Sequence, residues 1–135
     1  MIEIFVQSRY RVNRSLLRKR TTEFIRKLGI DTSLYTVSIA IIGDRKMRDI
    51  HERFARKKGT TPVLSFPITD GRPKIGSSID RKYRERLNTV DGQHLLGEII
   101  ISYPQTLLFA ADENKLVDVK LAEFVEHGLT KLLSG

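Results

Sequence analysis

One short segment, Leu95 to Ile101, restricts the fold of this chain more than any other. It reads Leu-Leu-Gly-Glu-Ile-Ile-Ile, which predicts a strand that is apolar on both faces. Such a strand belongs in the centre of a sheet or under good cover, because either face would otherwise leave apolar side chains in water. The sequence therefore predicts a sheet with at least one internal, covered strand.

The rest of the chain alternates between strand and helix patterns. Asn13 can cap the first helix and Gly29 can end it, while the last helix carries the apolar stripe of a core helix. The order of elements predicts an α+β domain, α/β-like, in which helices cover one mixed, mostly four-stranded sheet. Further strands are predicted at 2–6, 34–42 and 63–66, and helices at 13–28, 44–55, 104–111 and 117–133.

A length of 135 residues favours one domain over 1–135. Within it, segment 70–92 combines Gly, Pro, Ser and charged residues and is predicted to be a surface insertion. No apolar run approaches the roughly 20 residues that span a bilayer. We therefore expect a cytoplasmic protein that has no membrane partner.

The absence of cysteine excludes disulfides, Fe–S clusters, thiolate metal sites and cysteine nucleophiles. There is also no phosphate-cradling glycine loop, no G-x-S-x-G elbow and no H-E-x-x-H pattern of a helical zinc protease. The chain has three histidines: His51, His94 and His127. We expect His51 to contact the neighbouring loop and His94 to be solvated, which leaves His127 as the histidine with a functional interpretation.

The charge of the chain is strongly segregated along the sequence. Its 24 Lys and Arg and 16 Asp and Glu give a net charge of +8, but residues 1–86 carry +12 and residues 87–135 carry −4. Lys and Arg on one face favour a polyanionic partner, because binding neutralises phosphates and releases counterions. We expect RNA or a ribonucleoprotein, with a merely solubilising surface as the alternative. The candidate RNA-binding residues here are Arg14, Arg18 and Lys19 in the first helix and Arg56, Lys57 and Lys58 in the basic turn before Pro62.

Three segments carry a family pattern in the expected order. Residues 50–54 (IHERF) lead through Lys57-Lys58 to 61–67 (TPVLSFP), residues 96–102 read LGEIIIS, and residues 121–133 read LAEFVEHGLTKLL. They are similar to the blocks "LNxxyR…kxxTDVLSFP", "LGDIVIS" and "ELxxLxVHGxLHLxGYDH". In these blocks the chain resembles the YbeY family of bacterial rRNA-maturation endoribonucleases, which act on single-stranded RNA through a bound zinc ion. The resemblance covers most of the chain and implies a YbeY-like fold.

The resemblance also implies a site on the last helix. In the family, two histidines at i and i+4 share one helix face and a third follows, so that three imidazoles bind one zinc. His127 occupies the first position and is the metal candidate, Lys131 occupies the second, and the third would follow Gly135. A protonated lysine has no lone pair for a metal, so zinc is expected to be absent or weakly bound. The family's arginine position holds Ala55 with Arg56 beside it, so the catalytic candidates are Arg56 and His127.

Two functions follow from these residues. The first is a zinc-dependent endoribonuclease, in which zinc activates a water and Arg56 steadies the phosphate. The second is a non-catalytic RNA- or ribosome-binding module that keeps the fold and acts in small-subunit maturation, with Lys131 as a fixed ammonium group facing an RNA phosphate. A truncated form of a longer enzyme is a third interpretation. Glu123 lies one turn before His127 on the same helix face, which would allow a pair between the imidazole and this carboxylate. We instead expect Glu123 or Glu126 to form an ion pair with Lys131.

Overall fold

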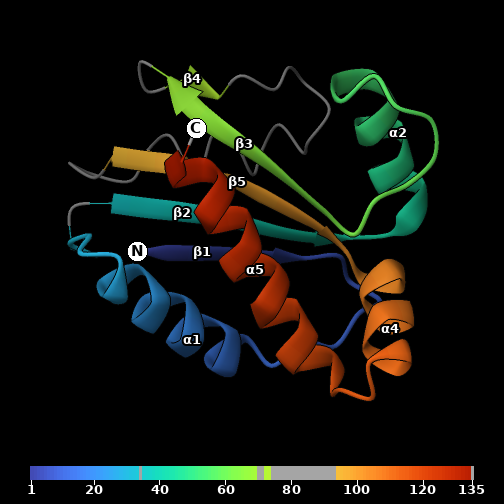
Figure 1. Ribbon diagram of the computed structural model, residues 1–135, viewed down its shortest axis with the longest axis horizontal. Helices are drawn as coiled ribbons and strands as arrows, with labels where there is room; N and C mark the ends of the chain where they lie inside the picture. Colours follow the sequence, from blue (N-terminus) through green and yellow to red (C-terminus); the bar gives the residue numbers. More distant parts are fainter. Residues whose placement is uncertain (34, 70–71, 74–93, 135) are drawn as a thin grey trace.

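Within residues 1–33, 35–69, 72–73 and 94–134, which this computed structural model describes, five strands form one mixed sheet. The strands are β1 (Ile2–Val6), β2 (Tyr35–Ile42), β3 (Val63–Thr69), β4 (Arg72–Pro73) and β5 (His94–Ser102). Their order across the sheet is β1-β2-β5-β3-β4 (Figure 1). β1, β2 and β5 are parallel, whereas β3 is antiparallel to both β5 and the two-residue β4.

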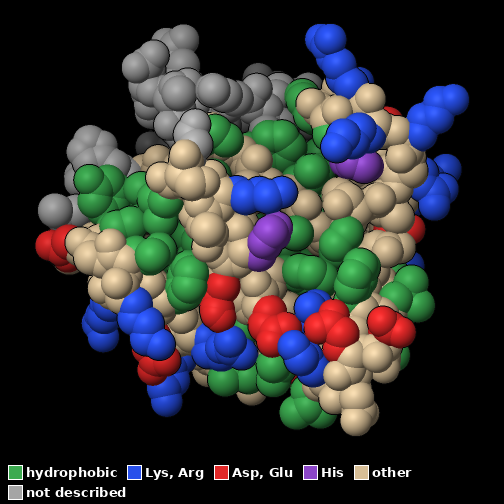
Figure 2. All heavy atoms as spheres, viewed as in Figure 1, with side chains coloured by type: hydrophobic (Ala, Val, Ile, Leu, Met, Phe, Trp, Pro, Cys, Tyr) green, Lys and Arg blue, Asp and Glu red, His purple; other side chains and the backbone are tan. Residues whose placement is uncertain are grey.

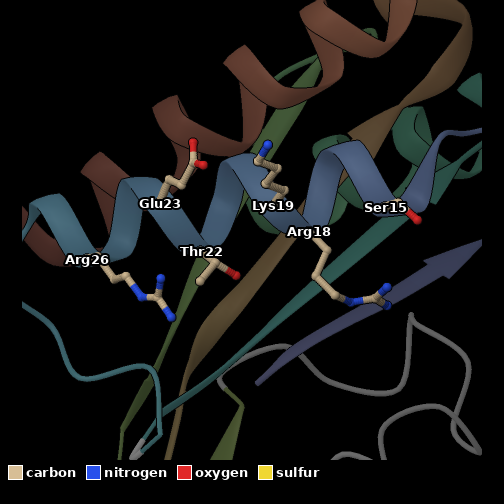
Figure 3. A pocket seen from close by; sticks show the side chains of 6 residues that line it. All are labelled: Ser15, Arg18, Lys19, Thr22, Glu23 and Arg26. Carbon is tan, nitrogen blue, oxygen red and sulfur yellow. The ribbon is translucent and has the colours of Figure 1, made fainter.

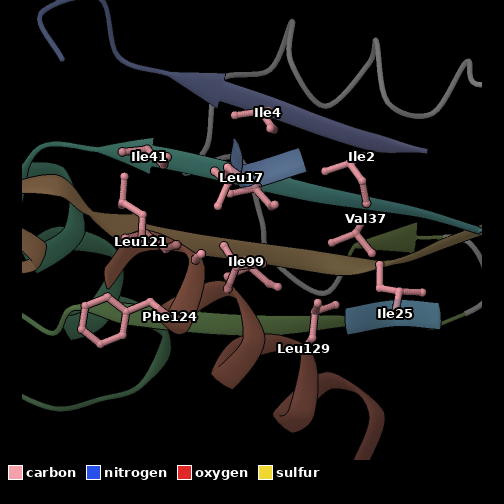
Figure 4. Packing of buried hydrophobic residues seen from close by; sticks show 14 residues of the cluster. Ile2, Ile4, Leu17, Ile25, Val37, Ile41, Ile99, Leu121, Phe124 and Leu129 are labelled. Atoms are coloured by element: carbon pink, nitrogen blue, oxygen red, sulfur yellow. The ribbon is translucent and has the colours of Figure 1, made fainter. Parts of the chain in front are cut away.

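Helices cover both faces of this sheet. The four described helices are α1 (Arg14–Lys27), α2 (Asp44–Phe54), α4 (Tyr103–Asp112) and α5 (Val117–Ser134). The alternation of side chains along β5 separates two cores, because successive residues of a strand point to opposite faces. Ile99 and Ile101 pack with α1 and α5 on one face (Figure 4), while Ile100 packs with Met47 and Ile50 of α2 on the other.

The predicted fold class is confirmed. The segment predicted to be a covered strand is β5, which lies between β2 and β3 with Ile99, Ile100 and Ile101 at most 1% exposed. β4 adds a short fifth strand to the four that were predicted. The predicted insertion 70–92 lies outside the described residues except for Arg72–Pro73 in β4, so it stays a prediction.

The signals at the ends of the first helix are also confirmed. The Asn13 side chain accepts a hydrogen bond of 3.0 Å from the Leu16 amide and thereby caps α1. Gly29 follows α1 with a φ of 80°, a left-handed conformation that glycine adopts without a steric penalty. The start of α1 is also bound to the last helix, because Asp118 accepts a 3.0 Å hydrogen bond from the Asn13 amide.

Two glycines allow α5 to lie close to the sheet. A Cβ atom at Gly128 of α5 would stand 2.9 Å from Cγ2 of Ile99 and 3.0 Å from Oγ of Ser65. A Cβ atom at Gly97 of β5 would stand 2.7 Å from Cδ2 of Leu132 in α5 and 2.8 Å from the carbonyl oxygen of Phe66 in β3. The Ser65 hydroxyl donates a 3.1 Å hydrogen bond to the Gly128 carbonyl. The helix is therefore held against β3 and β5 at a distance that only glycine permits.

Glu123 and Glu126 of α5 form ion pairs, but with partners other than Lys131. Glu126 accepts a 2.8 Å contact from Arg20 of α1. Glu123 binds Lys115 at 2.9 Å, and this hydrogen bond holds the pKa of Glu123 below its ordinary value. The expected pairing with Lys131 is wrong, because positions five or eight apart are not adjacent on a helix surface.

Replacing Gly128 by alanine tests the close approach of α5. Helix propensity alone favours alanine by about 1 kcal/mol, but overpacking a filled core costs about 1–3 kcal/mol. We expect Gly128→Ala to lower the free energy of unfolding, measured by urea denaturation. Thr130→Ala, at an exposed position of the same helix, should leave it nearly unchanged. A Gly128→Ala variant that is more stable than the parent chain would contradict the close contact.

Candidate functional site

His127 and Lys131 lie one turn apart on the exposed side of α5. Gly128 and Leu129 between them are buried against the sheet, so the two side chains emerge on the outer face of the helix. Within the described residues, neither side chain forms a hydrogen bond or an ion pair. The position predicted for the site thus presents to solvent a histidine and an ammonium group that has no ion-pair partner among the described residues.

The face that carries α5 is visible in Figure 2. Histidine side chains occupy separate places on this face, and each has Lys or Arg side chains beside it. Acidic side chains gather lower on the same face, where Lys and Arg side chains alternate with them. This arrangement agrees with the ion pairs of Glu113, Glu123 and Glu126 and leaves the Lys and Arg side chains beside the histidines outside the acidic cluster.

The basic loop after α2 is held in a defined conformation. The Nδ1 atom of His51 donates to the Gly59 carbonyl at 3.0 Å, and a Glu52 carboxylate oxygen accepts from the Gly59 amide at 3.1 Å. The Thr60 hydroxyl donates a 2.6 Å hydrogen bond to Asp44. The predicted contact of His51 with the neighbouring loop is therefore confirmed. Both ends of α2 anchor this loop.

Arg56, Lys57 and Lys58 project from this anchored loop. All three are exposed, and none forms an ion pair with a carboxylate of the described residues. Arg56 has a φ of 54°, which is uncommon for a residue with a Cβ atom and accompanies functional positions more often than others. No hydrogen bond links this loop to His127, so the structure does not join the two predicted catalytic residues directly.

β3 connects the loop with α5. The strand begins directly after the loop, and its Phe66 ring contacts Phe54 of α2 edge-on at a centroid distance of 6.0 Å. Ser65 of the same strand holds the Gly128 carbonyl. The basic loop and the His127 side of α5 are thus positioned by one strand.

A second cationic surface runs along α1. A shallow groove of about 480 Å³ is lined by Ser15, Arg18, Lys19, Thr22, Glu23 and Arg26. Figure 3 shows that Lys19 and Glu23 point to one side of the helix and Arg18 and Arg26 to the other. Arg26 was missed by the sequence analysis, although its i+8 spacing from Arg18 could have indicated it. Arg14 differs from the others, because its guanidinium donates to the Ile4 carbonyl at 3.0 Å.

The described residues do not fit a zinc centre. No three His, Cys, Asp or Glu side chains among them come together to hold a metal ion. One turn after His127, where the resemblance implies a second ligand, the side chain is that of Lys131. An ammonium group has no lone pair to donate, and its charge repels a divalent cation.

Fold and surface together define the class: an α+β domain whose last helix and basic loop present cations and a histidine to solvent. The family model described as endoribonuclease YbeY matches residues 4–134, so the chain belongs to this family. No helix of the described residues is long and apolar enough to cross a membrane.

Several relatives show the same similarity. An endoribonuclease YbeY from Anaeromyxobacter sp. (strain Fw109-5) is 29% identical over 117 residues, which cover 87% of this chain and 50% of the relative. One from Dehalococcoides mccartyi (strain ATCC BAA-2100) is 29% identical over 122 residues, which cover 90% of this chain and 73% of the relative. The chain therefore spans only about half the length of the Anaeromyxobacter protein.

A solved structure supports the fold. The solution structure of TM1509 from Thermotoga maritima matches with a TM-score of 0.58 and 19% sequence identity. The match covers 98% of this chain and 71% of the other. At this identity the likeness shows a shared architecture.

Removing the anchors of the basic loop should expose it to trypsin. His51→Ala and Glu52→Ala each delete one hydrogen bond to Gly59, worth about 1 kcal/mol. In the double variant we expect cleavage after Arg56, Lys57 and Lys58 to accelerate at least about fivefold, because proteolysis follows the population of the open loop. Asp49→Ala, on the same helix but without contact to the loop, is the control. Equal cleavage rates would show that these bonds do not order the loop.

Proposed function

We propose that this chain binds single-stranded RNA of the small-subunit rRNA precursor with the cationic face of α5 and the loop between α2 and β3. Membership of the YbeY family supports RNA as the partner, since the family model and the relatives are named for endoribonuclease activity. Ribosomal RNA also fits a chain with a net charge of +8. The proposal places the protein in the cytoplasm, where this RNA matures.

The observation that carries this proposal is that no carboxylate of the described part of the chain pairs with Lys131. Every acidic side chain of α5 that could neutralise a nearby cation is already bound: Glu123 by Lys115 and Lys120, and Glu126 by Arg20. Lys131 is exposed and has no carboxylate within ion-pair distance in the described residues. An ammonium group in this state is available to an RNA phosphate.

The other cations have complementary roles in this proposal. Arg56 offers a planar guanidinium that can donate two parallel hydrogen bonds to one phosphate. Lys57 and Lys58 add charge on the same anchored loop, and Arg18 and Lys19 extend the cationic surface along α1. Arg14 contributes least, because the Ile4 carbonyl already engages its guanidinium.

Replacing Lys131 by alanine tests the proposed contact. We expect Lys131→Ala to weaken binding of an unstructured, fluorescently labelled RNA about fivefold to tenfold, since the substitution removes one charge-assisted hydrogen bond to a phosphate. Fluorescence anisotropy at fixed salt measures the dissociation constant. Lys27→Ala, which removes an exposed cation at the end of α1 that is not part of the groove along this helix, is the matched control. If both variants weaken binding equally, Lys131 has no specific role.

The second candidate function is cleavage of that RNA. The names of the relatives favour it, and His127 is an exposed imidazole of the kind that transfers protons in catalysis. In this case Arg56 would steady the phosphate, and any metal would need ligands beyond His127. We propose that RNA binding by this chain proceeds without such a metal.

Zinc content and RNA cleavage separate the two candidates. We expect freshly purified protein to contain far less than one zinc per chain by elemental analysis and to leave single-stranded RNA intact with or without chelator. Intact RNA binding in the same samples serves as the control for folding. Stoichiometric zinc together with cleavage that a chelator abolishes would instead establish the metal-dependent endoribonuclease.

A further inference from the structure

A groove lies outside the carboxyl ends of β1 and β2, away from His127 and Lys131. Its volume is about 820 Å³, and it is bounded by the segment after β1, the first turn of α2 and the start of α4. α2 packs on the opposite face of the sheet from α5. In parallel sheets the crevice at this edge is a common place for ligands. The lining residues are Gln7, Arg9, Tyr10, Gly43, Asp44, Arg45, Lys46, Asp49 and Pro104.

In this groove the acidic side chains form ion pairs, whereas the basic side chains have no ion-pair partner among the described residues. Arg9, Arg45 and Lys46 are exposed, and none of them has a carboxylate within ion-pair distance in the described residues. The two acidic residues of the lining are paired with cations that do not line it: Asp44 lies 3.7 Å from Arg48, and Asp49 lies 4.0 Å from Arg53. Three cations are thus left facing the groove.

Asp44 is further committed to the protein itself. One of its carboxylate oxygens accepts a 2.6 Å hydrogen bond from Thr60 and a 3.2 Å hydrogen bond from Ser102. Asp44 therefore binds the first turn of α2 to the loop before β3 and to the end of β5. This use of Asp44 reduces its ability to neutralise Arg45 and Lys46, which follow it directly.

The positions of Arg45 and Lys46 oppose local helix stability. Both lie in the first turn of α2, where the helix dipole disfavours cations and favours anions. Cations at such a place are expected to destabilise the folded chain slightly. A residue that breaks a local folding rule without a structural gain indicates a functional constraint.

The wall of the groove is preorganised and aromatic. The Tyr10 ring stacks on Tyr103 of α4 with a centroid distance of 4.5 Å and an interplanar angle of 22°. Arg9 lies over the Tyr10 ring at 5.8 Å. The Gln7 carbonyl accepts from the Tyr10 amide at 3.0 Å, and the Gln7 side-chain oxygen accepts from the Gly43 amide at 2.9 Å. This segment is therefore held in place before any ligand binds.

From these observations we infer that the groove is a second contact for single-stranded RNA, in which Arg9, Arg45 and Lys46 bind phosphates of the strand. A basic groove beside aromatic rings is the combination that proteins use for single-stranded nucleic acid. The inference rests on the proposed function and deepens it. In this inference the RNA runs from the α5 face to the groove at the carboxyl ends of β1 and β2. An RNA strand that spans both contacts therefore binds more tightly than an RNA strand that occupies one.

The variant Arg45→Ala/Lys46→Ala tests this groove by two measurements, the affinity for RNA, which should fall, and the melting temperature, which should not fall. We expect the dissociation constant for an unstructured RNA to rise about tenfold and the slope of log affinity against log salt to become shallower by about 0.7 for each phosphate that the variant no longer neutralises. The melting temperature should stay the same or rise, because two cations leave the first turn of α2. A double variant with lowered melting temperature would assign these residues to folding and overturn the inference.

Two comparisons keep this test separate from the proposed function. A Lys27→Ala variant, in which the substituted residue lies outside this groove, should bind RNA like the parent chain. If the parent chain binds RNA and Lys131→Ala weakens it while Arg45→Ala/Lys46→Ala does not, the groove is not an RNA contact although the α5 face is. If the parent chain binds no RNA, both proposals fail. Unchanged RNA affinity combined with binding of an acidic peptide to the groove would also overturn the inference.

Discussion

The close approach of α5 to the sheet is the constraint on which the rest of this structure depends. Gly128 brings the helix backbone against Ile99 and Ser65, and Gly97 brings β5 against Leu132 and the backbone of β3. With these contacts in place, the rotation of α5 about its axis is set. His127 and Lys131 then face solvent while Leu129 is fully buried. The functional surface is thus a consequence of packing on the opposite side of the same helix.

The segregation of charge along the chain has a structural meaning. Residues 87–135 carry the acidic surplus, and their carboxylates at Glu113, Glu123 and Glu126 hold α5 to the connection between α4 and α5 and to α1. Within the described ranges, the cations on the loop after α2 and on the first turn of that helix have instead no ion-pair partner. Acidic groups are therefore used within the protein, and basic groups remain available to a partner.

Local signals explain how much of the fold could be predicted from sequence. The apolar run that became β5, the Asn13 cap and Gly29 each depend on a few neighbouring residues, so their structure follows from periodicity and turn chemistry. The three family blocks predicted the position of His127 and the basic loop in the same way. The structure then supplied the reason for the glycine after His127, which is the lack of space for a Cβ atom.

The remaining features depend on contacts between distant residues. The partner of Glu126 is Arg20, 106 positions away, and no spacing rule could indicate this pair. The groove at the carboxyl ends of β1 and β2 is formed by the segment after β1 together with α2 and α4. These segments are distant in the sequence, and the strand order of the sheet brings them together. Arg45 and Lys46 were visible in the sequence as part of a charged run, but their lack of ion-pair partners among the described residues is a property of the folded chain.

The salt dependence of RNA binding by the parent chain, measured in the presence of a chelator, tests the central claim most directly. A cationic face that contacts several phosphates should give a linear fall of log affinity with log salt, with a slope of about −0.7 per contact for a single strand. The affinity at each salt concentration should be the same without chelator. Affinity that does not change with salt, or that disappears when the chelator is added, would contradict this account.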